Sequence, residues 1–453
     1  MTLIQEDDVL EYSDIDEANR HKDLAISSSK EAVDNRDQEK KTDDSEDVEM
    51  TENEDPSLAS QSRQNNSDAQ LIPSFKDFML KPVLIKALMD IEFEHPSEVQ
   101  QQALPQALIG RDILCQGKSG SGKTAIFILS TLQNINLIRG EVSCAVLCHS
   151  RELAYQVNEE YKKFSKYMVD LITVASIGGT SIKNDGGVFK NKKKCPNIVV
   201  TTPGRLLVLV KNKIVDPTQL KTIVIDECDK VLSEEKMRNA FDEVFKLTLN
   251  EKQMMMFSAT LSNEAKEICQ KYTQNPLQIY IANEKKLILP RLKQYFFKVE
   301  EKRKTQKLTE ILDDVNFNQV IIFVKSPKNA KLLATILNEL NFTAITINGY
   351  TKTNLRLQNY KDFKENEVKI LVTTDMFGRG LDFKRVNLAI NYDLPISIDT
   401  FLHRVGRTGR FGSKGLAISF ISNKKDEEMI ENIQQRFDIR LQEAKNGEDI
   451  CVI

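Results

Sequence analysis

The chain has 453 residues, which is too long for one small module, because domains usually hold about 100 to 200 residues. Its formal net charge of −3 hides an uneven distribution: residues 1–70 carry 21 acidic and 7 basic residues, so the remainder carries 45 acidic and 56 basic ones. An acidic arm is therefore attached to a basic body, and that body suits a polyanionic ligand. No stretch approaches the ~18 apolar residues of a membrane helix, so we expect no membrane span.

The arm, residues 1–70, contains one aromatic residue, Tyr12, one proline and no glycine. Such a composition cannot bury enough apolar surface to offset the entropy of ordering, so we predict a disordered acidic tail. Two interpretations of it stay open. The tail either only solubilises the protein, or its segment DDVLEYSD (residues 7–14) docks on a partner.

From Pro73 onward, short runs rich in Val, Ile and Leu alternate with longer helical patterns, which is typical of a parallel α/β architecture. The runs fall into two sets, so we predict two similar domains, residues 71–283 and 295–445, joined by a linker at 284–294. The predicted strands of the first domain are 112–116, 145–149, 172–176, 197–202, 222–227 and 254–260, and those of the second are 319–326, 343–349, 369–375, 388–393 and 416–422.

The seven cysteines form no C-x-x-C pair. This argues against a zinc ribbon or a disulfide framework and suits a reducing compartment. Cys144 and Cys148 beside His149 lack a second pair of ligands, so we expect no metal there.

A glycine-rich loop follows the first predicted strand. Residues 117–124, GKSGSGKT, fit G-x-x-x-x-G-K-[ST] between a strand and an apolar helix. Its backbone N–H groups would wrap the phosphates of ATP, Lys123 would reach the outer phosphates, and Thr124 would offer a hydroxyl to Mg²⁺. The predicted ATP-binding residues of this loop are Ser119, Gly120, Ser121, Gly122, Lys123 and Thr124.

Two adjacent acids close the strand at 222–227. Asp226 would hold Mg²⁺, and Glu227 would orient and deprotonate the attacking water. A D-E-x-D string alone is usually a solvated turn, but after an apolar strand downstream of a phosphate-binding loop it indicates catalysis.

With these motifs the chain resembles the DEAD-box RNA helicases of the DECD subgroup over residues 75 to about 440. The resemblance implies two tandem RecA-like domains. It also implies that Gln100, in the run FEHPSEVQ, makes two hydrogen bonds to adenine and that Phe75 stacks on it. Glu92 stands where the family usually has glycine, so the turn there is expected to differ.

The resemblance also supplies RNA-contacting motifs, whose amides, hydroxyls and arginines suit a phosphate-sugar backbone rather than base edges. Each motif alone is compatible with an ordinary loop. The implied RNA-binding residues are Arg151, Gly178, Gly179, Thr202, Gly204 and Arg205 in the first domain and Arg356, Thr374 and Gly378 in the second.

Further residues are implied to link the two domains. Ser258, Thr260, Asp229 and His403 would couple hydrolysis to unwinding, although a purely structural hydroxyl turn is the alternative for the first two. Asp382 would touch the ribose. Arg407 and Arg410 would be arginine fingers that cross the cleft when the domains close.

Several stretches, such as EKQMMMFSATLS and FGRGLDFKRVNLAINYDLP, resemble the nuclear DECD helicases of splicing and mRNA export. Gly406, Thr408 and Gly117 stand where that subgroup often has alanine, and the C-terminal NGEDICVI also differs, so a diverged paralogue stays open. We expect a nuclear, RNA-stimulated ATPase that unwinds short duplexes or remodels RNA–protein complexes, with RNA and splicing or export factors as partners. Nothing in the sequence indicates an obligate oligomer. The alternatives are an ATP-gated RNA clamp and, less favoured, a DNA translocase.

Overall fold

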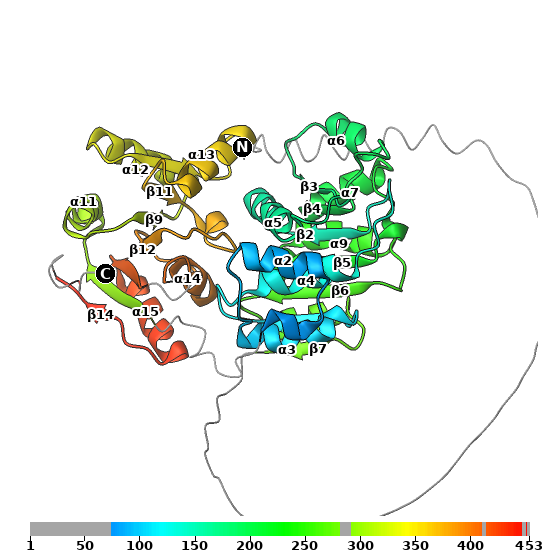
Figure 1. Ribbon diagram of the computed structural model, residues 1–453. Coiled ribbons are helices and arrows are strands. Elements are labelled where there is room, and N and C mark those ends of the chain that lie inside the picture. The colour runs from blue at the N-terminus through cyan, green and yellow to red at the C-terminus, as the bar shows by residue number, and fades with distance from the viewer. Residues whose placement is uncertain (1–73, 281–290, 410–413, 446–449, 451–453) are drawn as a thin grey trace, which may run out of the picture.

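A computed structural model describes residues 74–280, 291–409, 414–445 and 450. The predicted tail at 1–70, the linker residues 284–290 and Arg410 lie outside these residues. The described chain forms two domains side by side, each a twisted parallel sheet with helices on both faces (Figure 1). Among the described helices, none combines the length and the apolar character needed to cross a bilayer.

The sheet of domain 1 has seven strands in the order β3-β4-β2-β5-β6-β1-β7, and all its pairs are parallel. Most of its strands are buried throughout, as apolar runs covered on both faces should be. The strands are β1 (Ile113–Gln116), β2 (Cys144–Leu147), β3 (Thr173–Ser176), β4 (Ile198–Thr201), β5 (Thr222–Asp226), β6 (Gln253–Ser258) and β7 (Leu277–Ile279).

Several helices of domain 1 begin at a serine whose side chain accepts from a backbone N–H group of the first turn. Ser97 and Gln100 form a capping box at α3, and the Ser150 and Ser262 side chains cap α5 and α10. The helices are η1 (Phe75–Phe78), α2 (Pro82–Asp90), α3 (Glu98–Leu108), α4 (Lys123–Asn134), α5 (Arg151–Phe164), α6 (Ile182–Phe189), α7 (Pro203–Lys211), η2 (Pro217–Gln219), α8 (Cys228–Ser233), α9 (Glu235–Phe245) and α10 (Asn263–Gln270).

Domain 2 repeats this arrangement, since its order β10-β11-β9-β12-β13-β8-β14 is that of domain 1 when the strands are numbered from β8. Its strands are β8 (Leu292–Lys298), β9 (Gln319–Phe323), β10 (Ala344–Ile347), β11 (Ile370–Thr373), β12 (Val386–Asn391), β13 (Gly415–Ile421) and β14 (Gln442–Glu443). Its helices are η4 (Glu301–Arg303), α11 (Lys304–Asp314), α12 (Pro327–Glu339), α13 (Thr353–Glu365), η5 (Asp375–Phe377), α14 (Ile398–Val405) and α15 (Lys424–Phe437). The two-domain parallel α/β prediction is confirmed.

One boundary prediction was wrong. Strand β8 begins at Leu292, so residues 292–294 belong to the second sheet and not to a linker. The strand reads LKQYFFK and mixes charged with aromatic residues, so it lacks the apolar run that marked the other strands. Strands β7 and β14 also went unpredicted, because they have only three and two residues.

The two domains share a buried contact surface. An apolar cluster includes Leu153 and Val157 of α5 together with Tyr360 and Phe363 of α13. Tyr155 packs edge-on against Tyr360, with ring centroids 6.1 Å apart. Since the carboxyl ends of parallel strands carry the ligand-binding loops, this contact brings the loops of both sheets together.

Candidate functional site

The phosphate-binding loop lies between β1 and α4, as predicted. Gly120 and Gly122 have φ values of +75° and +83°, which L side chains rarely adopt. The ammonium group of Lys123 donates to the carbonyl oxygens of Gly117 (2.7 Å) and Lys118 (2.9 Å). The loop therefore brings the Lys123 ammonium group and the amino end of α4 together, an arrangement that suits an anion.

Gln100 holds this loop from α3. Its Nε2 donates to the carbonyl oxygen of Gly122 (3.0 Å), and its Oε1 accepts from the backbone N–H of Ser97 (2.8 Å). The family resemblance implied two hydrogen bonds from Gln100 to adenine. In this structure both polar atoms of the amide instead bond to the protein's own backbone, because capping α3 and bracing the loop already use them.

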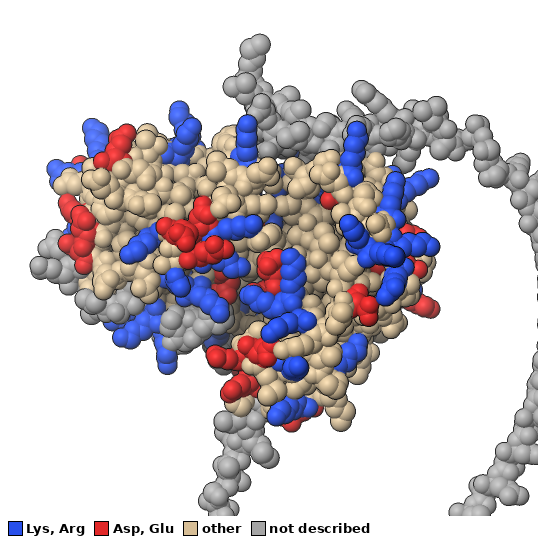
Figure 2. All heavy atoms as spheres, turned by 45° about the horizontal axis from the view of Figure 1, so that its top comes forward, with Lys and Arg blue, Asp and Glu red and all other residues tan. Residues whose placement is uncertain are grey.

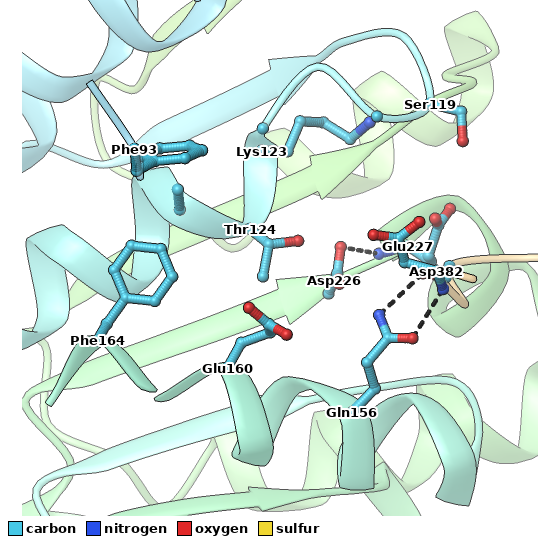
Figure 3. A pocket seen from close by; sticks show the side chains of 14 residues that line it. Phe93, Ser119, Lys123, Thr124, Gln156, Glu160, Phe164, Asp226, Glu227 and Asp382 are labelled. Carbon is cyan, nitrogen blue, oxygen red and sulfur yellow. Dashed lines mark hydrogen bonds between the residues drawn. The ribbon is translucent and has the colours of Figure 1, made fainter. Parts of the chain in front are cut away.

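The aromatic residue that lines the pocket differs from the predicted one. Phe75 is 2 % exposed and stacks on Phe93, with ring centroids 5.0 Å apart. Phe93 and Phe164 face the pocket (Figure 3), whereas Phe75 is not among the residues that line it. Phe93 is the first residue of the run FEHPSEVQ, in which Gln100 was recognised. The same run could therefore have identified Phe93.

The pocket has a volume of about 160 Å³ and is lined by both domains. Domain 2 contributes Gly380 and Asp382. The N–H of Asp382 donates to Oε1 of Gln156 (2.7 Å), a residue of α5 that the sequence did not single out. The full lining is Phe93, Ser119, Gly120, Gly122, Lys123, Thr124, Ala125, Gln156, Glu160, Phe164, Asp226, Glu227, Gly380 and Asp382.

Asp226 and Glu227 stand at the carboxyl end of β5 and are each 5 % exposed. Glu227 has φ +52°, and its N–H donates to Oδ1 of Asp226 (3.0 Å). Burial raises the pKa of the Asp226 carboxyl to about 7, and the neighbouring Glu227 carboxylate adds to the rise. A cation beside Asp226 would remove this penalty.

Asp229 joins elements of both domains. It accepts from the hydroxyls of Ser258 (2.7 Å) and Thr260 (3.0 Å) and forms an ion pair with Arg379 of domain 2. The Thr260 hydroxyl also bonds Nε2 of His403 (3.0 Å). The four predicted coupling residues therefore meet in one cluster, together with Arg379, which the sequence did not assign.

Arg407 reaches across the cleft. It is 1 % exposed; its Nη2 donates to Oγ of Ser119 (3.0 Å), its Nε donates to the carbonyl oxygen of His403 (3.0 Å), and its Nη1 to that of Leu381. A guanidinium from domain 2 thus touches the phosphate-binding loop of domain 1. Arg404, three residues earlier, instead pairs within domain 2 with Asp375 (2.5 Å).

The predicted RNA-contacting residues divide into two groups. Arg205 is 2 % exposed and bonds the carbonyl oxygen of Thr180 (2.9 Å) and the carboxylate of Asp185 (3.0 Å). Arg356 bonds both carboxylate oxygens of Glu152, at 2.7 and 2.8 Å. In this structure these two guanidinium groups bond to groups of the protein itself and not to an external phosphate.

The others stand at strand ends on the side where the sheets meet. Arg151 donates to the hydroxyl of Thr353 in domain 2 (2.7 Å) and lies against Gly178 and Gly179. Thr202 and Gly204 lie at the amino end of α7, where backbone N–H groups lack helical partners. Thr374 and Gly378 flank η5 in domain 2.

Comparison with known proteins supports the same assignment. The DEAD/DEAH box helicase family matches residues 97–268, and the family described as helicase conserved C-terminal domain matches residues 303–412. The chain is 50% identical over 438 residues to the ATP-dependent RNA helicase SUB2-1 of Vanderwaltozyma polyspora, which covers 97% of this chain and 96% of that protein. It is 55% identical over 369 residues to the ATP-dependent RNA helicase SUB2 of Saccharomyces cerevisiae, covering 82% and 83% of the two chains.

Among solved structures, S. cerevisiae Dbp5 bound to RNA and ADP BeF3 matches with a TM-score of 0.77 at 30% identity, covering 83% of this chain and 96% of that one. The chain is thus similar to known helicases along nearly its whole described length. It also has a phosphate-binding loop, two adjacent acids and an arginine that crosses the cleft. The chain belongs to the DEAD/DEAH box helicases.

Proposed function

We propose that the protein is an ATP-dependent RNA helicase, that is, an RNA-stimulated ATPase that locally unwinds short duplexes or remodels RNA–protein complexes. The observation that carries this proposal is the assembly of one site from two domains, in which Arg407 reaches the phosphate-binding loop and Arg379 reaches Asp229. A site that is complete only when the domains are together links hydrolysis to domain closure. The relatives' names as ATP-dependent RNA helicases support the same activity.

The pocket residues suit ATP with Mg²⁺. The loop amides and Lys123 would bind the phosphates, Phe93 and Phe164 would cover the base, and Asp382 would accept from the ribose. A hydroxyl from Thr124 and a carboxylate from Asp226 are hard oxygen ligands of the kind Mg²⁺ prefers. The buried Asp226 carboxyl, with its raised pKa, fits a cation. When bound, Mg²⁺ would neutralise charge that develops on the phosphates.

The remaining steps fall to side chains. Glu227 orients and deprotonates the attacking water, and Arg407 stabilises the charge of the transition state. Arg410 is proposed as the second finger on its motif alone. Arg151, Gly178, Gly179, Thr202, Gly204, Thr374 and Gly378 would hold the RNA backbone across both domains. ATP and RNA then favour the same closed state, so each strengthens the binding of the other.

We further propose that this activity serves pre-mRNA splicing and mRNA export in the nucleus, with factors of those processes as partners; the resemblance to nuclear DECD helicases supports this proposal. An ATP-gated RNA clamp is the second candidate, because the same closed state would hold RNA without separating strands.

The test is steady-state ATP hydrolysis with and without single-stranded RNA, beside Glu227→Gln. Stimulation by RNA that the substitution abolishes is the expected result; stimulation by DNA alone would refute the proposal. Displacement of a short RNA strand distinguishes the helicase from the clamp, which would instead retain RNA for minutes with ATP.

A further inference from the structure

A basic hollow lies at the amino ends of the strands of domain 1, opposite the nucleotide pocket at their carboxyl ends. It has a volume of about 540 Å³ and is lined by loops that precede β2, β3 and β4: Leu137, Arg139, Val169, Asp170, Ile172, Lys192, Lys193, Cys195 and Asn197. The domain 1 residues that are proposed to bind RNA follow those same strands. Because the strands are parallel, RNA held at their carboxyl ends does not cover this hollow.

The rim of the hollow is positively charged. Arg139, Lys192 and Lys193 line it, and the exposed Lys190 and Lys194 flank them in the chain. The one acid in the lining, Asp170, lies 3.3 Å from Arg139, but both side chains are more than two-thirds exposed, so the pair compensates little charge. Figure 2 shows lysine and arginine side chains gathered on the side of domain 1 that faces away from domain 2.

The hollow is also apolar between these charges. Val169 is 94% exposed and Leu137 is 40% exposed, and both line it together with the half-buried Ile172. No aromatic side chain is among the lining residues on which a base would stack. Aliphatic contacts surrounded by basic groups fit an acidic peptide that carries apolar side chains better than they fit a nucleic acid.

We propose that this basic hollow is the docking site of the chain's own acidic segment, residues 7–14 (DDVLEYSD). The segment has four acids and no base, and it places Val9, Leu10 and Tyr12 among them. The 59 residues between Asp14 and Ser74 would span at most about 200 Å when extended. A domain of this size has a radius of gyration of about 17 Å, so the segment reaches the hollow of its own chain.

Docking would cover the basic hollow until salt or a competing acidic protein displaces the segment. The contact is intramolecular, so it does not depend on protein concentration. It rests on exposed charges, so it weakens as ionic strength rises. The acidic arm would then cover a binding surface of domain 1 and not only solubilise the protein.

The test is photo-crosslinking in the full chain, with p-benzoylphenylalanine in place of Tyr12 and the products mapped by mass spectrometry. Crosslinks to the loops at 137–142, 168–172 and 190–197 within one chain are expected, with a yield that falls about fivefold or more between 50 and 500 mM salt. The triple variant Arg139→Glu, Lys192→Glu, Lys193→Glu should lose them. The matched control Lys302→Glu, Arg303→Glu, Lys369→Glu makes the same charge change on exposed residues of domain 2 and should keep them.

Both triple variants should keep RNA-stimulated ATPase activity and the thermal unfolding of the wild type, because none of the six residues belongs to the proposed site. Absent crosslinks, crosslinks only between two chains, crosslinks to the nucleotide cleft, or a yield that the hollow variant leaves unchanged would each overturn the proposal. Loss of RNA affinity in the hollow variant with intact arm crosslinks would assign the hollow to RNA instead.

Discussion

The ion pair between Arg356 and Glu152 is a buried polar link between the two domains. Arg356 uses two nitrogens on the two carboxylate oxygens, at 2.7 and 2.8 Å. The side chains of Arg356 and Glu152 are 5% and 0% exposed. When the domains separate, both groups return to water, so removal of one partner penalises the closed state alone.

The size of that penalty follows from the burial. Removing one partner of a buried pair typically costs about 3–5 kcal/mol, because the other charge stays buried and unpaired. Arg356→Ala should therefore disfavour closure by about 3–5 kcal/mol, or roughly 100-fold to several thousand-fold.

The assay is RNA affinity measured with and without a non-hydrolysable ATP analogue. Arg356→Ala should lose most of the enhancement that the analogue gives, and Glu152→Ala with Arg356→Ala should be less impaired than Arg356→Ala alone. Arg385→Ala, an exposed arginine of the same domain, is the matched control. A loss under threefold would refute the reasoning. If Arg356 contacts RNA phosphate instead, the two substitutions should act additively and the salt slope should fall by about one.

Three further predictions concern single positions. A Cβ at Gly380 (φ +69°) would lie 2.8 Å from Cδ2 of Leu153, so Gly380→Ala should reduce RNA-stimulated hydrolysis at least tenfold at unchanged ATP binding, and Leu153→Ala should restore part of it. Arg407→Ala should lower turnover roughly 10³-fold if the residue is a finger, and a loss under tenfold in a single-turnover assay would leave it structural. Burial lowers the pKa of His149 to about 4. Its protonation favours the unfolded chain, so the stabilisation is present above pH 6.5 and lost as pH falls toward 4. Urea unfolding should then show the wild type losing up to about 3 kcal/mol more than His149→Asn over that interval; equal slopes would contradict the pKa shift.

The phosphate-binding loop and the paired acids were predictable because their chemistry is local. Lys123 comes shortly after the buried strand β1 and Asp226 is the last residue of β5, so strand and motif appear in one stretch of sequence. The parallel sheets were predictable for the same reason. Strand β8 was missed because its alternating charged and aromatic residues lack that local signal.

Residues whose partners are distant in the sequence were harder to assign. Arg205 and Arg356 follow the pattern of exposed arginines after strands, yet Asp185 and Glu152 occupy their guanidiniums. In the sequence, Gln156 is an ordinary polar residue of a helix. Its role depends on the backbone N–H of Asp382, 226 residues later, which donates to it. Such pairs depend on how the two sheets meet, which no local pattern encodes.

Asp229 shows why hydrolysis and domain position are linked. Burial opposes its ionisation, yet the His403 ring and the Arg379 guanidinium hold the pKa of Asp229 below its usual range. Both of these groups come from domain 2, whereas Ser258 and Thr260 come from domain 1. If the domains part, the carboxylate loses its cationic partner two residues from Glu227, the proposed base. A substitution at Arg379 should therefore impair hydrolysis through the position of β5 and α8, even though the guanidinium pairs with Asp229 rather than with Glu227.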